Sequence, residues 1–152
     1  MKIDEEIKSS FTSPQQRAIV NIRFTSNFLG NIQNQFMSKY DLSMAQFNIL
    51  RILRGAKSAI NVQTVKERMI EKSPNTTRLM DKLIEKELIE RTRCTKDRRV
   101  VYVEISKEGL AVLKAIDDNS DILNMIQVGL SDQESQQLSD LLDKVRIHYH
   151  KK

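Results

Sequence analysis

The sequence is poor in the residues that build disulfide, metal-finger and nucleotide-loop proteins. Its 152 residues include one cysteine, which excludes a disulfide within the chain and a zinc finger with several cysteine ligands. Four glycines and two prolines leave little material for phosphate-binding loops or for the many turns of a large sheet. We therefore predict one mainly helical domain that needs no cofactor.

Long apolar runs are missing as well. The sequence contains nothing close to the roughly 18 uninterrupted apolar residues of a membrane-spanning helix. Its first residues, MKIDEE, are acidic and lack the apolar core of a signal peptide. We expect a cytoplasmic protein with no membrane partner.

Catalytic and metal-binding patterns are equally sparse. The two histidines, His148 and His150, are two residues apart near the carboxyl end, whereas metal ligands on one helix face are four apart. Cys94 lies between Arg93 and Lys96, a setting that can favour a reactive thiolate, although an inert thiol in a hairpin is the more frequent case. We predict neither an enzyme nor a metal site, and a redox role for Cys94 stays open.

Positive charge is concentrated in the middle of the chain. The net charge is +5, from 25 basic and 20 acidic side chains. Residues 43–107 hold 15 Lys and Arg against 8 Asp and Glu, a local charge of +7, and the remaining residues carry −2. This asymmetry is typical of a nucleic-acid-binding module flanked by segments with another purpose.

Capping residues and helical spacing predict the first four helices. Ser13 and Pro14 begin a long helix that we expect to end near Lys39, and a capping box at residues 43–46 begins a second helix that should stop at Gly55. A short third helix over residues 62–69 and a fourth from Ser73 and Pro74 follow. The connection between these two should be residues 70–73 at most, which fits a helix-turn-helix.

The apolar period then changes from helical to alternating. Residues 89–93 and 101–105 predict a β-hairpin with a basic loop. Ser106 should cap a fifth helix that carries Leu123, and a capping box at residues 131–134 should open a sixth. A helix pair followed by a basic hairpin predicts a winged helix-turn-helix, in which the second helix of the pair enters the major groove.

Candidate DNA contacts follow from this arrangement. On the fourth helix the inward apolar stripe leaves an outward polar face, and the residues expected to contact DNA from the helix and its start are Ser73, Asn75, Thr77, Arg78 and Lys82. In the hairpin the corresponding residues are Arg93, Lys96, Asp97, Arg98 and Arg99, with a local charge of +4 over residues 91–99.

Three motifs in order resemble the multiple-antibiotic-resistance regulator (MarR) family over essentially the whole chain. Residues 42–50, LSMAQFNIL, are similar to the family's Leu-Thr-x-x-Gln-Phe-x-x-Leu. The others are residues 75–83, NTTRLMDKL, and residues 97–99, DRR, followed by Val101-x-Val103-x-Ile105-Ser106-x-x-Gly109.

The resemblance implies an obligate homodimer that binds a pseudo-palindromic operator. Residues 1–41 and 107–152 would supply the dimerisation helices, and residues 42–106 the winged helix-turn-helix lobe. The alternative for the terminal segments is that their apolar stripes pack only within one chain; two long helices around so small a lobe favour the dimer. In the family's wing, the acid corresponding to Asp97 holds the arginine corresponding to Arg99 for minor-groove insertion, and Arg98 would contact phosphate. Family members often accept small aromatic acids as effectors, so we expect a repressor relieved by a small effector, with double-stranded DNA and a second copy of the chain as partners.

Two positions depart from the family pattern. Glu87 stands where the family commonly has a glycine that caps the recognition helix, which puts the left-handed conformation there in doubt. Arg93 replaces a frequent wing proline.

A protein-interaction module that binds an acidic partner is the alternative hypothesis. It would explain the charge, but not the combination of Asn75, Thr77 and Arg78 on one helix face with an Asp-x-Arg wing. DNA binding through several phosphates should weaken steeply with salt, which distinguishes the two.

Overall fold

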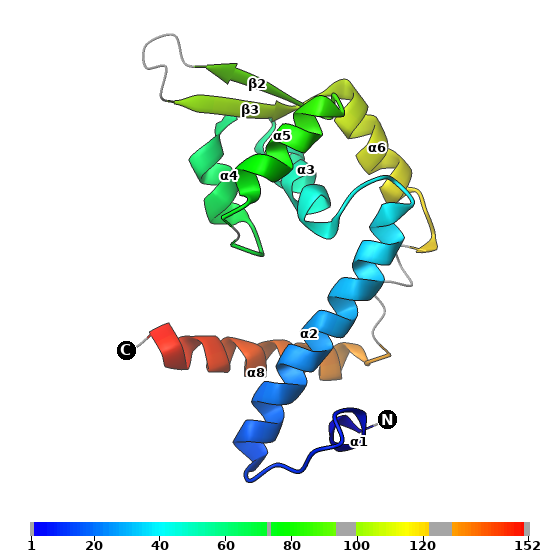
Figure 1. The fold of residues 1–152 in the computed structure, drawn as a ribbon, viewed down its shortest axis with the longest axis vertical. Helices are drawn as coiled ribbons and strands as arrows, with labels where there is room; N and C mark the ends of the chain where they lie inside the picture. The colour runs from blue at the N-terminus through cyan, green and yellow to red at the C-terminus, as the bar shows by residue number, and fades with distance from the viewer. Residues whose placement is uncertain (1, 73, 94–99, 122–128, 151–152) are drawn as a thin grey trace. The chain divides into compact units, whose positions relative to one another are not determined.

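A short sheet packs against helices in the first of two units of the chain. The computed structural model describes residues 2–72, 74–93, 100–121 and 129–150, in units of residues 1–118 and 119–152 (Figure 1). The elements are α1 (Ile3–Glu6), α2 (Pro14–Ser38), α3 (Met44–Ala56), β1 (Ile60–Asn61), α4 (Val62–Arg68), α5 (Thr76–Glu85), β2 (Ile89–Arg93), β3 (Val101–Ile105), α6 (Lys107–Asp117) and α8 (Asp132–His150).

Side-chain caps begin the helices where the sequence predicts them. The Ser13 hydroxyl accepts a hydrogen bond from the Gln16 N–H at 3.1 Å, and Pro14 takes the first helical position of α2. At α3 the Ser43 hydroxyl accepts from the Gln46 N–H at 3.2 Å, while the Gln46 side-chain oxygen accepts from the Ser43 N–H at 2.9 Å. Both helix starts are confirmed.

Two helix ends differ from the prediction. Helix α3 continues through Gly55 to Ala56, and Lys57, with φ 58°, takes the left-handed conformation that a terminal glycine would supply. The glycine is helical because the turn toward β1 falls two residues later. Helix α6 ends at Asp117, before Leu123, which lies outside the described residues.

The connection between α4 and α5 is longer than predicted. Helix α4 ends at Arg68 because Met69 turns to an extended conformation (φ −60°, ψ 136°) and is buried. The Ile70 N–H bonds the Asn48 side-chain oxygen at 3.1 Å instead of continuing the helix. Helix α5 begins at Thr76, where the first side chain enters the core, rather than at Ser73 and Pro74. The connection is thus residues 69–75, with Ser73 outside the described residues.

The sheet contains the predicted hairpin and one additional strand. Its order is β1-β3-β2 with antiparallel pairs, and Arg91 lies opposite Val103. The two-residue strand β1 is too short to show an alternating pattern in the sequence. Since alternate residues share a face, Arg91 and Arg93 lie on the same face of the hairpin as the buried Ile89 and Val103.

Helix α3 forms the centre of the lobe. It contacts α4, α5, α6 and β3 (Figure 1). The fully buried side chains from these elements include Ile49, Leu50, Leu53, Val65, Leu83, Val103, Leu113 and Ile116. This core fixes α5 and the hairpin on one scaffold.

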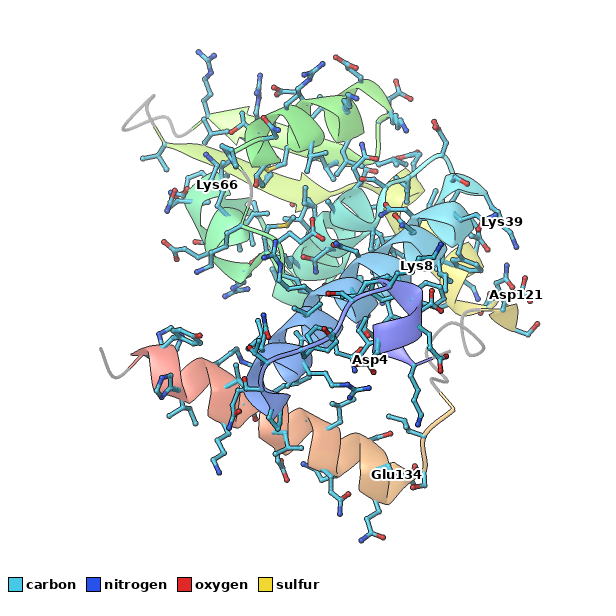
Figure 2. The ribbon with its side chains drawn as sticks, turned by 60° about the horizontal axis from the view of Figure 1, so that its bottom comes forward. Asp4, Lys8, Lys39, Lys66, Asp121 and Glu134 are labelled. Carbon is cyan, nitrogen blue, oxygen red and sulfur yellow. The ribbon has the colours of Figure 1, made fainter. Side chains whose placement is uncertain are left out.

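Helix α1 was not predicted from the sequence. Its Ile3 is buried, and Asp4 forms an ion pair with Arg17 of α2 in which the nearest atoms are 2.8 Å apart (Figure 2 labels Asp4). A four-residue helix lacks the two turns needed for a periodic signal.

The Asp4–Arg17 pair gives a testable pH dependence. The side-chain hydrogen bond from Arg17 is the main cause that holds the pKa of Asp4 below its usual value. Because the pKa is lowered in the folded protein, this stabilisation is complete above the pKa of the unfolded chain and is lost as the pH falls through the folded value. A carboxyl NMR titration should therefore show the Asp4 pKa rising in Arg17→Gln.

Glu134 provides the control for that titration. The Ser131 N–H and hydroxyl keep the pKa of Glu134 low without any contribution from Arg17. The Glu134 pKa should be the same in wild type and Arg17→Gln. An Asp4 pKa that the substitution leaves unchanged would contradict the pairing.

Helix α8 starts as predicted and exposes several large apolar side chains. The Glu134 N–H donates to the Ser131 hydroxyl at 3.3 Å, and the Ser131 N–H donates to the Glu134 carboxylate at 2.9 Å (Figure 2 labels Glu134). Within Asp132–His150 no residue is buried, and the exposed large apolar side chains are Leu138, Leu141, Ile147 and Tyr149. Neither α8 nor any other described helix is long and apolar enough to cross a membrane.

Candidate nucleic-acid interface

Helix α5 separates an apolar face from a polar one. Thr76, Met80 and Leu83 are at most 2% exposed and anchor one side of the helix in the lobe. The exposed residues include Asn75, at the N-cap, with Thr77, Arg78 and Lys82. Four of the five residues predicted on this element therefore lie together at the surface, and the fifth, Ser73, lies outside the described residues.

The exit of α5 keeps the conformation that the family glycine would supply. Glu87 has φ 59°, and its N–H donates to the Ile84 carbonyl at 2.9 Å. The Leu88 N–H donates to the Leu83 carbonyl, also at 2.9 Å. These two bonds form a Schellman motif, so the doubt raised by Glu87 is answered: the left-handed cap is present with a glutamate in it.

Replacing Glu87 with glycine should stabilise the protein. In the left-handed conformation, a residue with a side chain destabilises the folded protein by roughly 1–2 kcal/mol relative to glycine. Glycine offsets part of this difference, because it loses more conformational entropy on folding. We expect Glu87→Gly to raise the free energy of unfolding by about 0.5–1 kcal/mol in a urea titration.

The matched control is Glu85→Gly. Glu85 is the last residue of α5 and is exposed, so the same substitution should lower the free energy of unfolding by about 0.5–1 kcal/mol. An equal loss of stability in both variants would contradict the left-handed conformation of Glu87.

Ser106 connects the exit of α5 to the hairpin and to α6. Its hydroxyl donates to the Glu87 carbonyl at 2.7 Å and accepts from the Gly109 N–H at 2.9 Å. The Ser106 N–H donates to the Leu88 carbonyl at 3.1 Å. A Cβ on Gly109 would overlap that same carbonyl oxygen, so close approach of two backbones requires glycine here.

The hairpin carries part of the predicted wing. Arg93 ends β2, is exposed, and pairs in register with Val101. The other predicted wing residues, Lys96, Asp97, Arg98 and Arg99, lie outside the described residues, as does Cys94. The Asp-x-Arg arrangement at the wing tip therefore stays a prediction.

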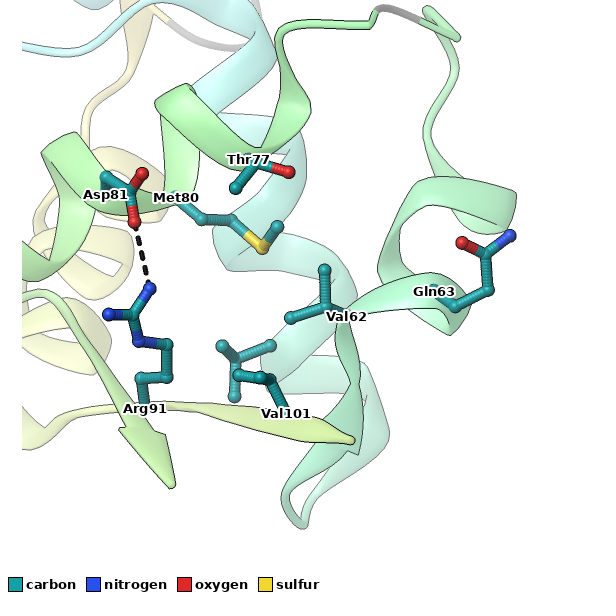
Figure 3. A pocket seen from close by; sticks show the side chains of 8 residues that line it. Val62, Gln63, Thr77, Met80, Asp81, Arg91 and Val101 are labelled. Carbon is teal, nitrogen blue, oxygen red and sulfur yellow. Dashed lines mark hydrogen bonds and ion pairs between the residues drawn. The ribbon is translucent and has the colours of Figure 1, made fainter. Parts of the chain in front are cut away.

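An ion pair that sequence reasoning missed joins α5 to the hairpin. Arg91 of β2 donates to Asp81 of α5 with 3.1 Å between Nη1 and Oδ1 (Figure 3). Beside it is a cavity of about 230 Å³ whose apolar lining residues are Val62, Met80, Val101 and Val103. In the sequence Arg91 is one of five basic residues of the hairpin, and nothing there indicates that it differs from the others.

The described residues offer little for metal chemistry. Among them, no group of three or more His, Cys, Asp or Glu side chains could hold a metal ion. His148 and His150 are exposed on the last turn of α8, where the His148 ring packs edge-on against Tyr149 with 5.3 Å between ring centroids.

Comparisons with known proteins agree with the geometry. A family model described as transcriptional regulator SarA/Rot matches residues 31–116, more than half of the chain. The regulator MhqR of Bacillus subtilis is 30% identical over 117 residues, which cover 76% of this chain and 79% of MhqR. PecS of Dickeya dadantii is 34% identical over 119 residues, which cover 76% and 71%.

A solved structure shares the fold. The crystal structure of a mutant MarR from Escherichia coli, complexed with operator DNA, aligns with a TM-score of 0.77 at 24% identity. The alignment covers 90% of this chain and 99% of that one. The chain therefore belongs to the MarR family of winged-helix, DNA-binding transcriptional regulators, a family of regulators and not of enzymes.

Proposed function

We propose that this protein is a homodimeric, sequence-specific repressor of a pseudo-palindromic operator. The observation that carries the proposal is the exposed face of α5, where Asn75, Thr77, Arg78 and Lys82 lie beside a basic hairpin. Arginine and asparagine are the side chains that bind guanine and adenine edges through two hydrogen bonds. The MarR structure with the same fold contains operator DNA, which supports this use of the face.

We propose different roles for most of the candidate residues. Arg78 and Asn75 read base edges, and Lys82 binds a phosphate. Ser73 and the first N–H groups of α5 face another phosphate. In the wing, Arg93, Lys96 and Arg98 bind the backbone, and Arg99, held by Asp97, enters the minor groove.

Exposed apolar residues on the terminal helices support the homodimer. Helix α2 exposes Ile19, Phe28 and Ile32 by 41%, 55% and 42%, and α8 exposes four further large apolar side chains. Such surface is stable in water when a second copy covers it. We propose that residues 1–41 and 107–152 form this dimerisation region and that residues 42–106 form the DNA-binding lobe.

Release from DNA is proposed to follow a change in the spacing of the two lobes. Two recognition helices must lie roughly 34 Å apart to enter successive major grooves. A small effector that binds more tightly to another spacing shifts the population away from the DNA-compatible state. A repressor of this kind acts on chromosomal DNA, so the proposal places it in the cytoplasm.

A salt series distinguishes operator binding from binding to an acidic protein. Fluorescence anisotropy with a labelled duplex should show that the logarithm of the association constant falls linearly with the logarithm of the salt concentration, with a slope of roughly one for each phosphate contact. Unlabelled specific duplex should compete far better than random duplex. Equal competition by random duplex and by polyglutamate would instead favour the acidic-partner module.

The molecular mass in solution tests the proposed homodimer. Sedimentation equilibrium should give twice the 17.6 kDa of one chain. Leu141→Asp on the exposed face of α8 should shift the equilibrium toward the monomer, because it places a charge in a proposed apolar interface. Ser139→Asp adds the same charge on the opposite side of the helix, two residues before Leu141, and serves as the control. Equal effects of both substitutions would contradict an interface through Leu141.

A further inference from the structure

The recognition helix and the wing are joined at their outer edge by one ion pair among the described residues. Asp81 of α5 and Arg91 of β2 lie ten positions apart in the chain, and their side chains are 47% and 44% exposed. Figure 3 shows the two side chains pointing toward one another from the helix and the strand. The contact is therefore at the surface, between the two elements proposed to contact DNA.

An open pocket lies next to the pair. The pocket of about 230 Å³ is lined by residues of α5, the start of α4 and the hairpin, and Figure 3 shows Met80 on the helix side and Val101 on the β3 side. Asp81 and Arg91 also line this pocket, and both side chains are about half exposed. Their ion pair therefore joins the helix to the hairpin at the rim of the pocket, where solvent reaches between the two elements.

Asp81 places a negative charge among the proposed DNA contacts of α5. Its neighbours on the helix include Lys82 and Arg78, which are proposed to contact a polyanion. A carboxylate beside them repels phosphate unless a cation neutralises it. Arg91 supplies that cation from the hairpin.

We propose that Asp81 and Arg91 are positioning residues that clamp the wing to the recognition helix. The pair holds the hairpin at the distance from α5 at which both elements engage the duplex at once. Asp81 acts through Arg91 and does not contact DNA. The inference rests on the proposed DNA-binding function, and it concerns residues that the comparisons do not assign.

The clamp and a simple electrostatic role make opposite predictions for Asp81→Asn. Removing a negative charge from a DNA-facing helix should tighten binding if the carboxylate has no positioning role. If the clamp is correct, the same substitution should weaken specific binding about threefold to fivefold. Glu85→Gln removes a carboxylate from the same helix without touching Arg91, so it is the matched control and should leave affinity unchanged or slightly higher.

A charge exchange tests the pair as a unit. Arg91→Asp alone should weaken binding strongly, because two carboxylates then face each other. Asp81→Arg combined with Arg91→Asp restores opposite charges at the net charge of the wild type, and we expect it to recover most of the affinity lost by Arg91→Asp. No recovery in the double variant would mean that Arg91 acts directly on DNA, which overturns the clamp.

A second measurement needs no DNA. The single cysteine, Cys94, directly follows β2 and can carry a nitroxide label in the wild type, Asp81→Asn and Glu85→Gln. The electron-spin-resonance spectrum of the free protein should show a more mobile label in Asp81→Asn only. Equal mobility in all three proteins would overturn the clamp. A mobile label in Asp81→Asn, with operator binding absent even in the wild type, would support the clamp and contradict the proposed function, so the two failures are distinguishable.

Discussion

Gly109→Ala should lower the free energy of unfolding by about 3 kcal/mol, at the upper end of the range for overpacked sites. The added Cβ would overlap the Leu88 carbonyl oxygen and come within 2.8 Å of Cγ1 of Ile105. The carbonyl cannot easily move, since it accepts the Ser106 N–H and directly follows the left-handed residue Glu87. Urea denaturation followed by circular dichroism measures the loss.

Gly55→Ala is the control for this substitution. Gly55 is exposed inside α3, and a Cβ there would meet no atom of the described structure within 4 Å. Alanine is the better helix former, so we expect a gain of about 0.5–1 kcal/mol. Equal stability of Gly109→Ala and wild type would show that the helix exit, the hairpin and α6 are not packed as described.

Arg78→Ala should weaken operator binding about tenfold to a hundredfold and relax the sequence preference at one base-pair position. The reason is that an exposed arginine on the outward face of α5 can donate two hydrogen bonds to one guanine. Binding titrations with the operator and with single-base variants measure both effects.

Lys82→Ala provides the contrast on the same face. A lysine that binds phosphate contributes equally to every sequence, so its loss should weaken all duplexes alike and reduce the salt slope by about one. If Arg78→Ala also weakens operator and random duplex by the same factor, Arg78 contacts the backbone and does not read bases.

Local chemistry explains which parts of the fold the sequence predicts well. Helices α2, α3, α6 and α8 begin directly after Ser13, Ser43, Ser106 and Ser131, and these starts are predictable because a serine hydroxyl caps each first turn. The start of α5 and the end of α3 depend instead on tertiary packing. Thr76 is the first side chain of α5 to enter the core, and the left-handed residue after α3 is a lysine, which propensity alone would not select.

The candidate site also contains residues that the sequence predicts and residues that depend on tertiary packing. The outward face of α5 follows from its inward stripe, so Asn75, Thr77, Arg78 and Lys82 could be placed at the surface from periodicity. The Asp81–Arg91 pair could not, because it depends on how a strand faces a helix across the hairpin register. The left-handed conformation of Glu87, where the family commonly has glycine, also could not be predicted, because it depends on the two backbone hydrogen bonds at the end of α5.

Selection of bound duplexes from random DNA by the purified protein tests the proposed function most directly. A dimer with two recognition helices should recover an inverted repeat whose half-sites lie about one helical turn, roughly 34 Å, apart. Arg78→Ala should recover the same repeat with one position degenerate. A pool in which no motif is enriched, or only a single half-site without its inverted partner, would contradict a dimeric reader of DNA sequence.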